Sequence, residues 1–304
     1  MRIILGGGTG FIGKALLKSL IEAGHDVVLL TRDPEKAKQR IGNTVTMSQW
    51  DGKSVGPCKE HLDGADAVIN LAGEPVIGKR WSHTQKMRIL NSRVDATKAL
   101  TSVMGQVKKK PSVFINASAV GYYGHVENGD VPESHPKGSG FLGDLSEQWE
   151  SEARVAEQWG IRVVLLRTGI VLEKDGGALY KMVPPFRFFA GGPLGSGRQW
   201  FPWVHRDDVI GIILFALENP DLKGPINTTA PNPVTMNVFC KTLGKVLGRP
   251  SWAPVPAQML RFLLGESAEV LLTGQRAVPK KLEALGYPFR YPTLDAALTA
   301  ILRR

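Results

Sequence analysis

Cysteines are few in this chain of 304 residues, and long apolar runs are absent. Its two thiols, Cys58 and Cys240, are too few for a disulfide framework or a cysteine-based metal cluster, so we expect no metal site. No apolar stretch approaches the roughly 18 residues that a membrane-spanning helix needs. The sequence therefore predicts an intracellular protein without a membrane partner, cytoplasmic by default, with an organelle left open.

Charge is also not concentrated in any one segment. The chain has 38 Lys and Arg against 28 Asp and Glu, a formal net charge of +10, and the only tight basic run is 108–110. We interpret that run as a solvated helix end. No basic stripe or known motif indicates nucleic-acid binding, so no nucleic-acid partner is expected. The excess of positive charge permits attraction to anionic lipid or to an anionic small ligand.

The first half of the chain alternates short apolar runs with helical patterns. The runs are rich in Val and Ile and are continuous, as is typical of parallel strands covered on both faces. Strand–helix repetition of this kind predicts an α/β fold with a Rossmann-type, doubly wound parallel sheet. The expected strands are Arg2–Leu5, Val27–Leu30, Ala67–Leu71, Val113–Ala117 and Val163–Leu166, and the expected helices are Phe11–Ala23, Trp81–Met104 and Phe141–Trp159.

Beyond about Gly176 the chain becomes richer in clustered Gly and Pro. Helical patterns follow at Asp207–Leu217, Val234–Leu247 and Pro256–Leu264. We predict a nucleotide-binding domain over residues 1–175 and a smaller, irregular C-terminal substrate lobe over 176–304. Some segments of that lobe are expected to return to the main sheet.

The most informative segment is the glycine-rich stretch that follows the first strand. It satisfies the spacings Gly8-x-Gly10-x-x-Gly13 and Gly7-x-x-Gly10-x-x-Gly13. An early glycine permits a tight turn, Gly10 lets the backbone approach a pyrophosphate, and Gly13 lets the helix pack closely on the strand. Amides at the helix N-terminus then hold the phosphates. The segment predicts a dinucleotide site.

The end of the second strand predicts which dinucleotide binds. An NAD enzyme places Asp or Glu there, but Thr31 and Arg32 stand in this position, 18 and 19 residues after Gly13. A guanidinium over the ribose favours a 2′-phosphate, so the predicted cofactor is NADP(H). Asp33, one position later, leaves a ribose-binding acid as an alternative, and a merely solvated role for Arg32 is another.

Two further strand ends are expected at the cofactor. The third strand ends near Trp50 and Asp51, where a side chain meets the adenine or, for Trp50, packs in the core. The fourth ends at Leu71-Ala72-Gly73-Glu74, where small residues let the backbone pass the ribose. The candidate cofactor-binding residues are Gly7, Thr9, Gly10, Phe11, Ile12, Gly13, Thr31, Arg32, Asp51, Leu71, Ala72, Gly73, Glu74 and Arg167.

Together these motifs resemble the short-chain dehydrogenase/reductase superfamily, in its extended or atypical, epimerase-like branch. The resemblance is strongest to a subgroup of uncharacterised epimerase-family proteins and covers nearly the whole chain. It implies a nicotinamide cofactor, a small-molecule substrate and a homodimer through the helices Trp81–Met104 and Phe141–Trp159. It rests on Gly7–Gly13, Asn70–Gly73, Ser118–Gly124 with Glu133, Arg167–Leu172, Gly195–Gln199, Trp203–Asp208 and Gly224–Asn227.

The catalytic pair of that superfamily is missing. Its members use a Ser or Thr after the fifth strand and a Tyr-x-x-x-Lys pair on the next helix, and Ser118 fits the first position. No tyrosine here is followed four residues later by Lys, and Leu142 and Ser146 stand near the expected places. Ser118 and Tyr122 are therefore the candidate catalytic residues. Tyr123 and Glu74 are alternatives, as is plain aromatic packing for both tyrosines.

Other residues carry two interpretations each. His205 is either a general acid or a structural side chain at a helix start. Arg198 and Gln199 either hold a substrate phosphate or keep a loop solvated. The leading hypothesis is an NADP(H)-dependent oxidoreductase or epimerase-like enzyme with an atypical acid–base group, acting on a small carbonyl, hydroxyl or nucleotide-sugar-like substrate. The competing hypothesis is a catalytically silent, NADP-binding regulator or redox sensor.

Overall fold

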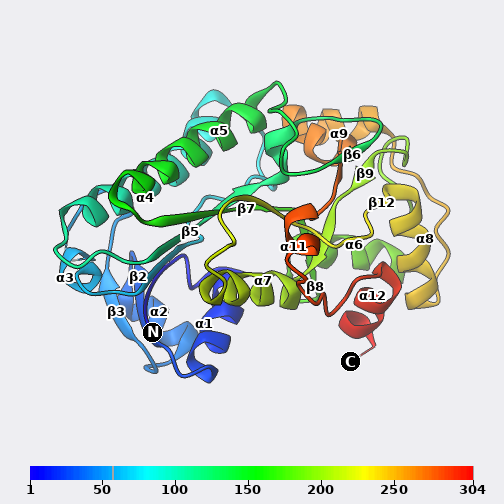
Figure 1. The fold of residues 1–304 in the computed structure, drawn as a ribbon. Coiled ribbons are helices and arrows are strands. Elements are labelled where there is room, and N and C mark those ends of the chain that lie inside the picture. The colour runs from blue at the N-terminus through cyan, green and yellow to red at the C-terminus, as the bar shows by residue number, and fades with distance from the viewer. Residues whose placement is uncertain (57, 304) are drawn as a thin grey trace.

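A seven-stranded sheet with helices on both faces organises the molecule, in a computed structural model that describes residues 1–56 and 58–303 (Figure 1). All neighbouring strands in it are parallel. Chain order runs outward in both directions from β1, so the predicted doubly wound fold is confirmed. The strands in spatial order are β11 (Gly224–Thr228), β7 (Arg162–Thr168), β5 (Val113–Ala119), β4 (Ala67–Asn70), β1 (Arg2–Gly6), β2 (Asp26–Thr31) and β3 (Thr46–Gln49).

The continuous apolar runs form central strands because both faces of the sheet are covered. In β1, Ile3 and Leu5 pack into one core layer and Ile4 into the other, and all three are fully buried. A strand with alternating polar residues would expose one face to water, so these runs specify a sandwiched, parallel arrangement.

Helices on the two faces connect successive strands. On one face lie α1 (Gly13–Glu22), α2 (Pro34–Ile41) and α7 (Arg206–Glu218), and on the other lie α3 (Cys58–Leu62), α4 (His83–Gln106) and α5 (Phe141–Arg154), which continues into η2 (Val155–Trp159). α2 gave no apolar pattern in the sequence because Ala37 is its one buried residue. It is instead capped at its start by Asp33 and begins with Pro34.

The second half of the chain builds a third core layer and small sheets. β11 is a strand of the main sheet and α7 packs against that sheet, so these segments of residues 176–304 return to it. The remaining elements are η1 (Val120–Tyr123), β6 (Asp130–Val131), β8 (Ile170–Glu173), α6 (Gly177–Arg187), β9 (Trp200–Phe201), β10 (Trp203–His205), β12 (Val234–Thr235), α8 (Met236–Leu247), α9 (Ala257–Leu264), η3 (Gly265–Ala268), α10 (Glu269–Leu272), β13 (Arg276–Ala277), α11 (Lys280–Ala284) and α12 (Leu294–Leu302).

Helix α6 was not expected, because it contains Pro184 and Pro185. A proline inside a helix removes a backbone N–H and so leaves a carbonyl one turn earlier without its bond. Both prolines lie on the exposed side of α6, where water satisfies those carbonyls, while Leu179, Val183 and Phe186 are buried on the opposite side. Burial of that apolar face holds the helix together despite the prolines.

The sequence predicted no disulfide framework and no membrane-spanning helix, and the structure bears on both predictions. Cys58 and Cys240 are both free and buried, and burial raises the pKa of the Cys58 thiol to about 11. In the part of the chain that the structure describes, no helix combines the length and apolar character needed to cross a membrane.

The glycine loop after β1 lies against the end of β4, and this contact can be tested. Gly7 has a φ of +79°, and a Cβ there would lie 2.6 Å from the carbonyl carbon of Leu71. Gly24 has a nearly identical φ of +76° with nothing within 4 Å of the same position, so it is a matched control. Gly24→Ala should cost about 1–2 kcal/mol for the left-handed backbone alone. Gly7→Ala should cost a further 1–3 kcal/mol or so, because backbone must move.

Urea titration of both variants and the parent chain measures these free energies of unfolding. Equal losses for the two variants would show that the approach of Gly7 to Leu71 imposes no constraint.

Candidate nucleotide-binding site

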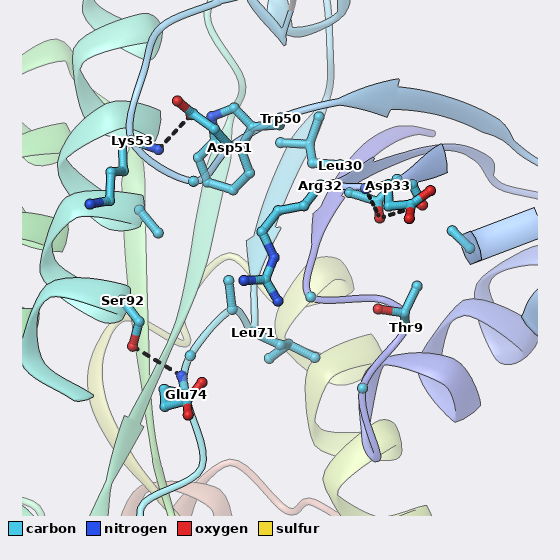
Figure 2. A pocket seen from close by; sticks show the side chains of 18 of the residues that line it. Thr9, Leu30, Arg32, Asp33, Trp50, Asp51, Lys53, Leu71, Glu74 and Ser92 are labelled. Atoms are coloured by element: carbon cyan, nitrogen blue, oxygen red, sulfur yellow. Dashed lines mark hydrogen bonds between the residues drawn. The ribbon is translucent and has the colours of Figure 1, made fainter. Parts of the chain in front are cut away.

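A cavity of about 520 Å³ opens at the carboxyl ends of β1, β2, β3 and β4 (Figure 2). This is the point where the chain order of the sheet reverses, and ligands of doubly wound folds bind there. Ten of the fourteen predicted cofactor residues line the cavity: Gly7, Thr9, Gly10, Thr31, Arg32, Asp51, Leu71, Ala72, Gly73 and Glu74.

The glycine loop that leads into α1 forms one wall of this cavity, through Gly7, Thr9 and Gly10. The N-cap residue, Ile12, provides no side-chain hydrogen bond, and the first turn of α1 holds no acidic residue. No side chain therefore competes with an anion for this helix start, which lies in the field of the helix dipole, although the Lys14 N–H already donates to the Gly10 carbonyl at 3.0 Å. Gly10 donates its N–H to the Gly7 carbonyl at 3.0 Å, which closes the turn. These features fit a pyrophosphate.

Phe11, Ile12 and Gly13 do not line the cavity but position the loop that does. A Cβ on Gly13 would lie 2.2 Å from the Gly7 carbonyl oxygen, so only glycine lets α1 pack this closely. The Phe11 ring lies against Gly176, where a Cβ would come within 2.6 Å of it, and the Arg206 guanidinium lies 5.2 Å from the ring centroid. Phe11 thus connects the loop to the second half of the chain.

At the end of β2, Arg32 extends into the cavity toward Leu71 (Figure 2). Lys36 and Arg40 also line the cavity, from helix α2. Residues 36 and 40 are four apart and so share one face of that helix. Three cations therefore line the cavity beside the end of β2, a charge distribution that suits a phosphate group.

Asp33, the alternative ribose-binding acid, is hydrogen-bonded within the protein. The Asp33 carboxylate accepts the Lys36 N–H at 2.9 Å and caps α2. Its backbone N–H lies 3.4 Å from the Thr31 hydroxyl. The cap explains why an acid occurs one residue after the position where NAD enzymes place theirs.

Asp51 and Trp50 shape the side of the cavity after β3. The Asp51 Oδ1 atom accepts the backbone N–H groups of Lys53 and Ser54, each at 2.8 Å, and the Ser54 hydroxyl at 3.0 Å. The two backbone hydrogen bonds hold the pKa of Asp51 below its usual value. The Trp50 indole donates to the Ser54 carbonyl at 2.9 Å and is 4% exposed, so it both packs in the core and lines the cavity.

The segment after β4 is fixed by helix α4. The Glu74 N–H donates to the Ser92 hydroxyl at 3.0 Å, and the Arg93 guanidinium donates to the Glu74 carbonyl at 2.8 Å. A Cβ on Gly73 would lie 3.0 Å from that guanidinium, which explains the small residue there. Burial lowers the pKa of Arg93 to about 10. The Glu74 carboxylate lies 3.4 Å from the Lys79 ammonium.

Arg167, the fourteenth predicted residue, lies outside the residues that line this cavity. It is 3% exposed and forms a two-point ion pair with Glu150 of α5, with both N–O distances 2.8 Å. It also donates to the Tyr123 hydroxyl at 3.0 Å and to the Glu133 carbonyl at 3.1 Å. Every nitrogen of its guanidinium is thus engaged within the protein interior.

Ser118 and Tyr122, the candidate catalytic residues, both contact this ion pair. Ser118 donates its hydroxyl hydrogen to Glu150 at 2.7 Å. The Arg167 guanidinium lies 3.5 Å from the centroid of the Tyr122 ring. Ser118, Glu150, Arg167 and Tyr122 therefore form one cluster where β5 and β7 end.

Tyr123 is bound on the far side of the same cluster. It donates to the Asn227 side chain at 2.6 Å, and burial raises the pKa of its phenol to about 12. Since its hydroxyl joins Arg167 to Asn227, Tyr123 has a structural role in the described interior.

The remaining predicted residues have contacts that favour structural roles. His205 accepts the Asp207 N–H at 3.0 Å as the cap of α7, and its ring stacks on Tyr291 at 3.9 Å. Gln199 donates to two backbone carbonyls, whereas Arg198 is exposed. Within residues 1–56 and 58–303, no group of three or more His, Cys, Asp or Glu side chains is arranged to hold a metal.

Several residues that line the cavity were not identified from sequence. Lys36, Arg40 and Lys53 line the cavity, as do Asn91 and Ser92 from α4. The four-residue spacing of Lys36 and Arg40 after Arg32 was a usable signal. The α4 residues carried none, because their approach to the cavity depends on how the helix packs.

The chain matches the family model described as NAD dependent epimerase/dehydratase family over residues 3–229, and a domain of unknown function, DUF1731, over 255–301. It is 43% identical to the chloroplastic SDR39U1 homolog of Arabidopsis thaliana, over 100% of this chain and 87% of that protein. It is 40% identical to the epimerase family protein YfhF of Bacillus subtilis, over 99% and 98%.

Two solved structures of epimerase-family proteins have the same fold as this chain. Human epimerase family protein SDR39U1, crystallised with NADPH, superposes with a TM-score of 0.90 at 35% identity over the full length of both chains. UDP-glucuronic acid 4-epimerase of Bacillus cereus shares the fold at a TM-score of 0.78 and 20% identity, over 99% and 98% of the two chains. With the family model spanning most of its length and relatives this similar, the chain belongs to the NAD dependent epimerase/dehydratase family.

Proposed function

We propose that this protein is an NADP(H)-dependent oxidoreductase or epimerase-like enzyme that acts on a small carbonyl, hydroxyl or nucleotide-sugar-like substrate. The observation that carries the proposal is the cavity at the sheet edge, where Arg32, Lys36 and Arg40 share the lining with the glycine loop that leads into the uncapped helix α1. The NADPH in the human SDR39U1 structure supports the choice of cofactor.

Each part of the cavity has a role in this proposal. The amides at the start of α1 hold the pyrophosphate, Arg32 with Lys36 and Arg40 hold the 2′-phosphate, and Asp51 and Trp50 flank the adenine. The bound nicotinamide supplies hydride transfer, and the protein supplies orientation. We retain residues 1–175 as the nucleotide domain and 176–304 as the substrate lobe.

The contacts of the cluster at the ends of β5 and β7 support roles for Ser118 and Tyr122 in proton transfer. A carboxylate only accepts hydrogen bonds, and Ser118 gives its single hydroxyl hydrogen to Glu150. Ser118 is thereby left as an acceptor toward a ligand, so in this proposal it orients a substrate hydroxyl. Tyr122, held against Arg167, exchanges the proton.

A specific observation also favours the second candidate function, a catalytically silent regulator or redox sensor. The Tyr-x-x-x-Lys pair is absent, and the groups at the ends of β5 and β7 are largely engaged with one another. Such a protein binds NADPH and presents the loaded form to a partner without consuming the cofactor.

The cofactor assignment is tested by removing one cation. Arg32→Ala should weaken NADPH binding by about 1.5–3 kcal/mol, or roughly 10- to 100-fold in Kd, and leave NADH binding nearly unchanged. Lys38→Ala is the control, because Lys38 lies on α2 but does not line the cavity. Calorimetric titration gives both constants. An equal loss for the two cofactors, or no loss for NADPH, contradicts the role of Arg32.

The catalytic assignment is tested by NADPH oxidation against a panel of carbonyl compounds. Tyr122→Phe should lower kcat by about 100-fold, since a positioned acid contributes at least that much, and Ser118→Ala should lower it by a smaller factor. Tyr180→Phe, at an exposed tyrosine of α6, should not change the rate. If no compound consumes NADPH and a protein partner binds only the loaded form, the regulator hypothesis replaces the enzyme.

We further propose a homodimer through α4 and α5, which pack side by side on one face of the sheet (Figure 1). Sedimentation velocity should show a species of twice the chain mass. A sample that remains monomeric across the accessible concentration range removes the dimer from the proposal.

A further inference from the structure

Acidic residues are completely absent from two long stretches of the second half of the chain. Residues 176–206 and 222–265 contain none of the 28 Asp and Glu, although together they make up 75 of the 304 positions. The same stretches contain nine Lys and Arg. They contain the helices α6, α8 and α9, the strands β9, β10, β11 and β12, and the loops that join these elements.

These stretches also carry an exposed group of aromatic rings, which we call the aromatic tip: Phe188, Phe189 and Trp252. Their exposed fractions are 82%, 55% and 68%. The Trp252 indole donates to the Phe189 carbonyl at 2.8 Å, so the end of α6 and the loop after α8 are held together as one surface. Phenylalanine side chains this exposed are not part of the core, so folding does not account for them.

The backbone of Phe189 adopts a left-handed conformation that is unfavourable for a residue with a side chain. Phe189 has a φ of 60°, the only positive φ of a non-glycine residue in the described chain. Phe189 lies just after the end of α6. Its N–H donates to the Phe186 carbonyl, and the N–H of Ala190 donates to the Pro185 carbonyl. Glycine is the usual residue at this helix end because it has no Cβ. A phenylalanine there keeps a ring on the surface at a cost in stability, which points to a function for the ring.

Two arginine side chains neighbour these rings. Arg187 precedes Phe188 directly, and the Arg249 guanidinium lies 4.6 Å from the centroid of the Phe189 ring. Both arginines are exposed, and no ion pair to either is found among the described residues. Farther along α8, Lys245 is paired with Asp295 of α12.

We propose that the aromatic tip attaches the protein reversibly to a membrane surface rich in anionic lipid. Exposed Phe and Trp rings insert at the boundary of headgroups and acyl chains, and neighbouring arginines bind the anionic headgroups. The absence of acidic residues over both stretches removes the repulsion that such a surface would otherwise meet. This proposal departs from the sequence-based expectation of no membrane partner. It does not involve a membrane-spanning helix, and none is found among the described residues.

Two other occupants fit the observations less well. A second copy related by two-fold symmetry would bring Arg187 and Arg249 of both chains together without an acid between them. A stable protein partner needs about 800 Å² on each side, more than three rings at one helix end present. Lipid attachment needs only a few inserted rings and nearby cations.

The tip also lies away from the nucleotide site. In Figure 1, α6 and α8 lie on the opposite side of the molecule from α2 and β3. The proposal is therefore independent of the proposed function, and substitutions in the tip should leave NADPH binding unchanged.

The test is co-sedimentation of the full chain with vesicles of phosphatidylcholine, alone or mixed with phosphatidylglycerol. The parent chain should pellet with the mixed vesicles only, and less at high salt. Phe188→Ser combined with Trp252→Ser should weaken binding by about tenfold or more, and so should Arg187→Glu combined with Arg249→Glu. Leu285→Ser, at an exposed apolar position directly after α11, should bind like the parent.

Phe189→Gly provides a readout that a purely structural role cannot reproduce. It should raise the temperature of unfolding, because the strained backbone is relieved, while lowering vesicle binding. A lower unfolding temperature would overturn the claim that the ring is kept at a cost.

Other results overturn the proposal as a whole. They are failure to bind mixed vesicles, equal binding to neutral vesicles, and a tip variant that binds like the parent. Retention on immobilised poly-glutamate without vesicle binding assigns the tip to an acidic protein instead. A dimer that dissociates only in the Phe188→Ser, Trp252→Ser variant assigns it to a second copy.

Discussion

The close approach of three backbone segments at one edge of the sheet underlies the rest of the structure. The loop after β1 passes so near the end of β4 that Gly7 has no room for a side chain, and α1 packs so near the same loop that Gly13 has none either. Since both contacts are backbone to backbone, they cannot be adjusted by a change of rotamer. They determine where the amides of α1 point and how wide the nucleotide cavity opens.

Much of this arrangement was predictable from the sequence, because the signals were local. Continuous runs such as Ile3–Leu5 fixed the parallel sheet, and the glycine spacing fixed the loop and helix that follow it. The position of Arg32 relative to Gly13 gave the phosphorylated cofactor, the one crystallised with the human relative. Each of these inferences depends on neighbours in sequence and on few tertiary contacts.

Other features depended on contacts between distant segments and were missed or left open. Helix α2 buries only Ala37 and so showed no apolar pattern, and α6 forms despite two prolines because its other face is buried. The contact between the Arg167 guanidinium and Glu150, 17 residues earlier in the chain, was not predicted, and the role of Arg167 at the cofactor stays a prediction. No spacing rule anticipates such a partner, since it arises only when α5 lies across β5 and β7.

That partnership has a consequence for how the chain can change over generations. Neither the guanidinium nor the carboxylate can be altered by itself without stranding an unbalanced charge in the interior, which is far more disruptive than replacing both. Ser118 contacts Glu150, and Tyr122 and Tyr123 contact Arg167, so a substitution at any of the five positions disturbs the same buried ion pair. Substitutions in exposed loops leave no such charge unbalanced, so they are the less costly route by which recognition can change.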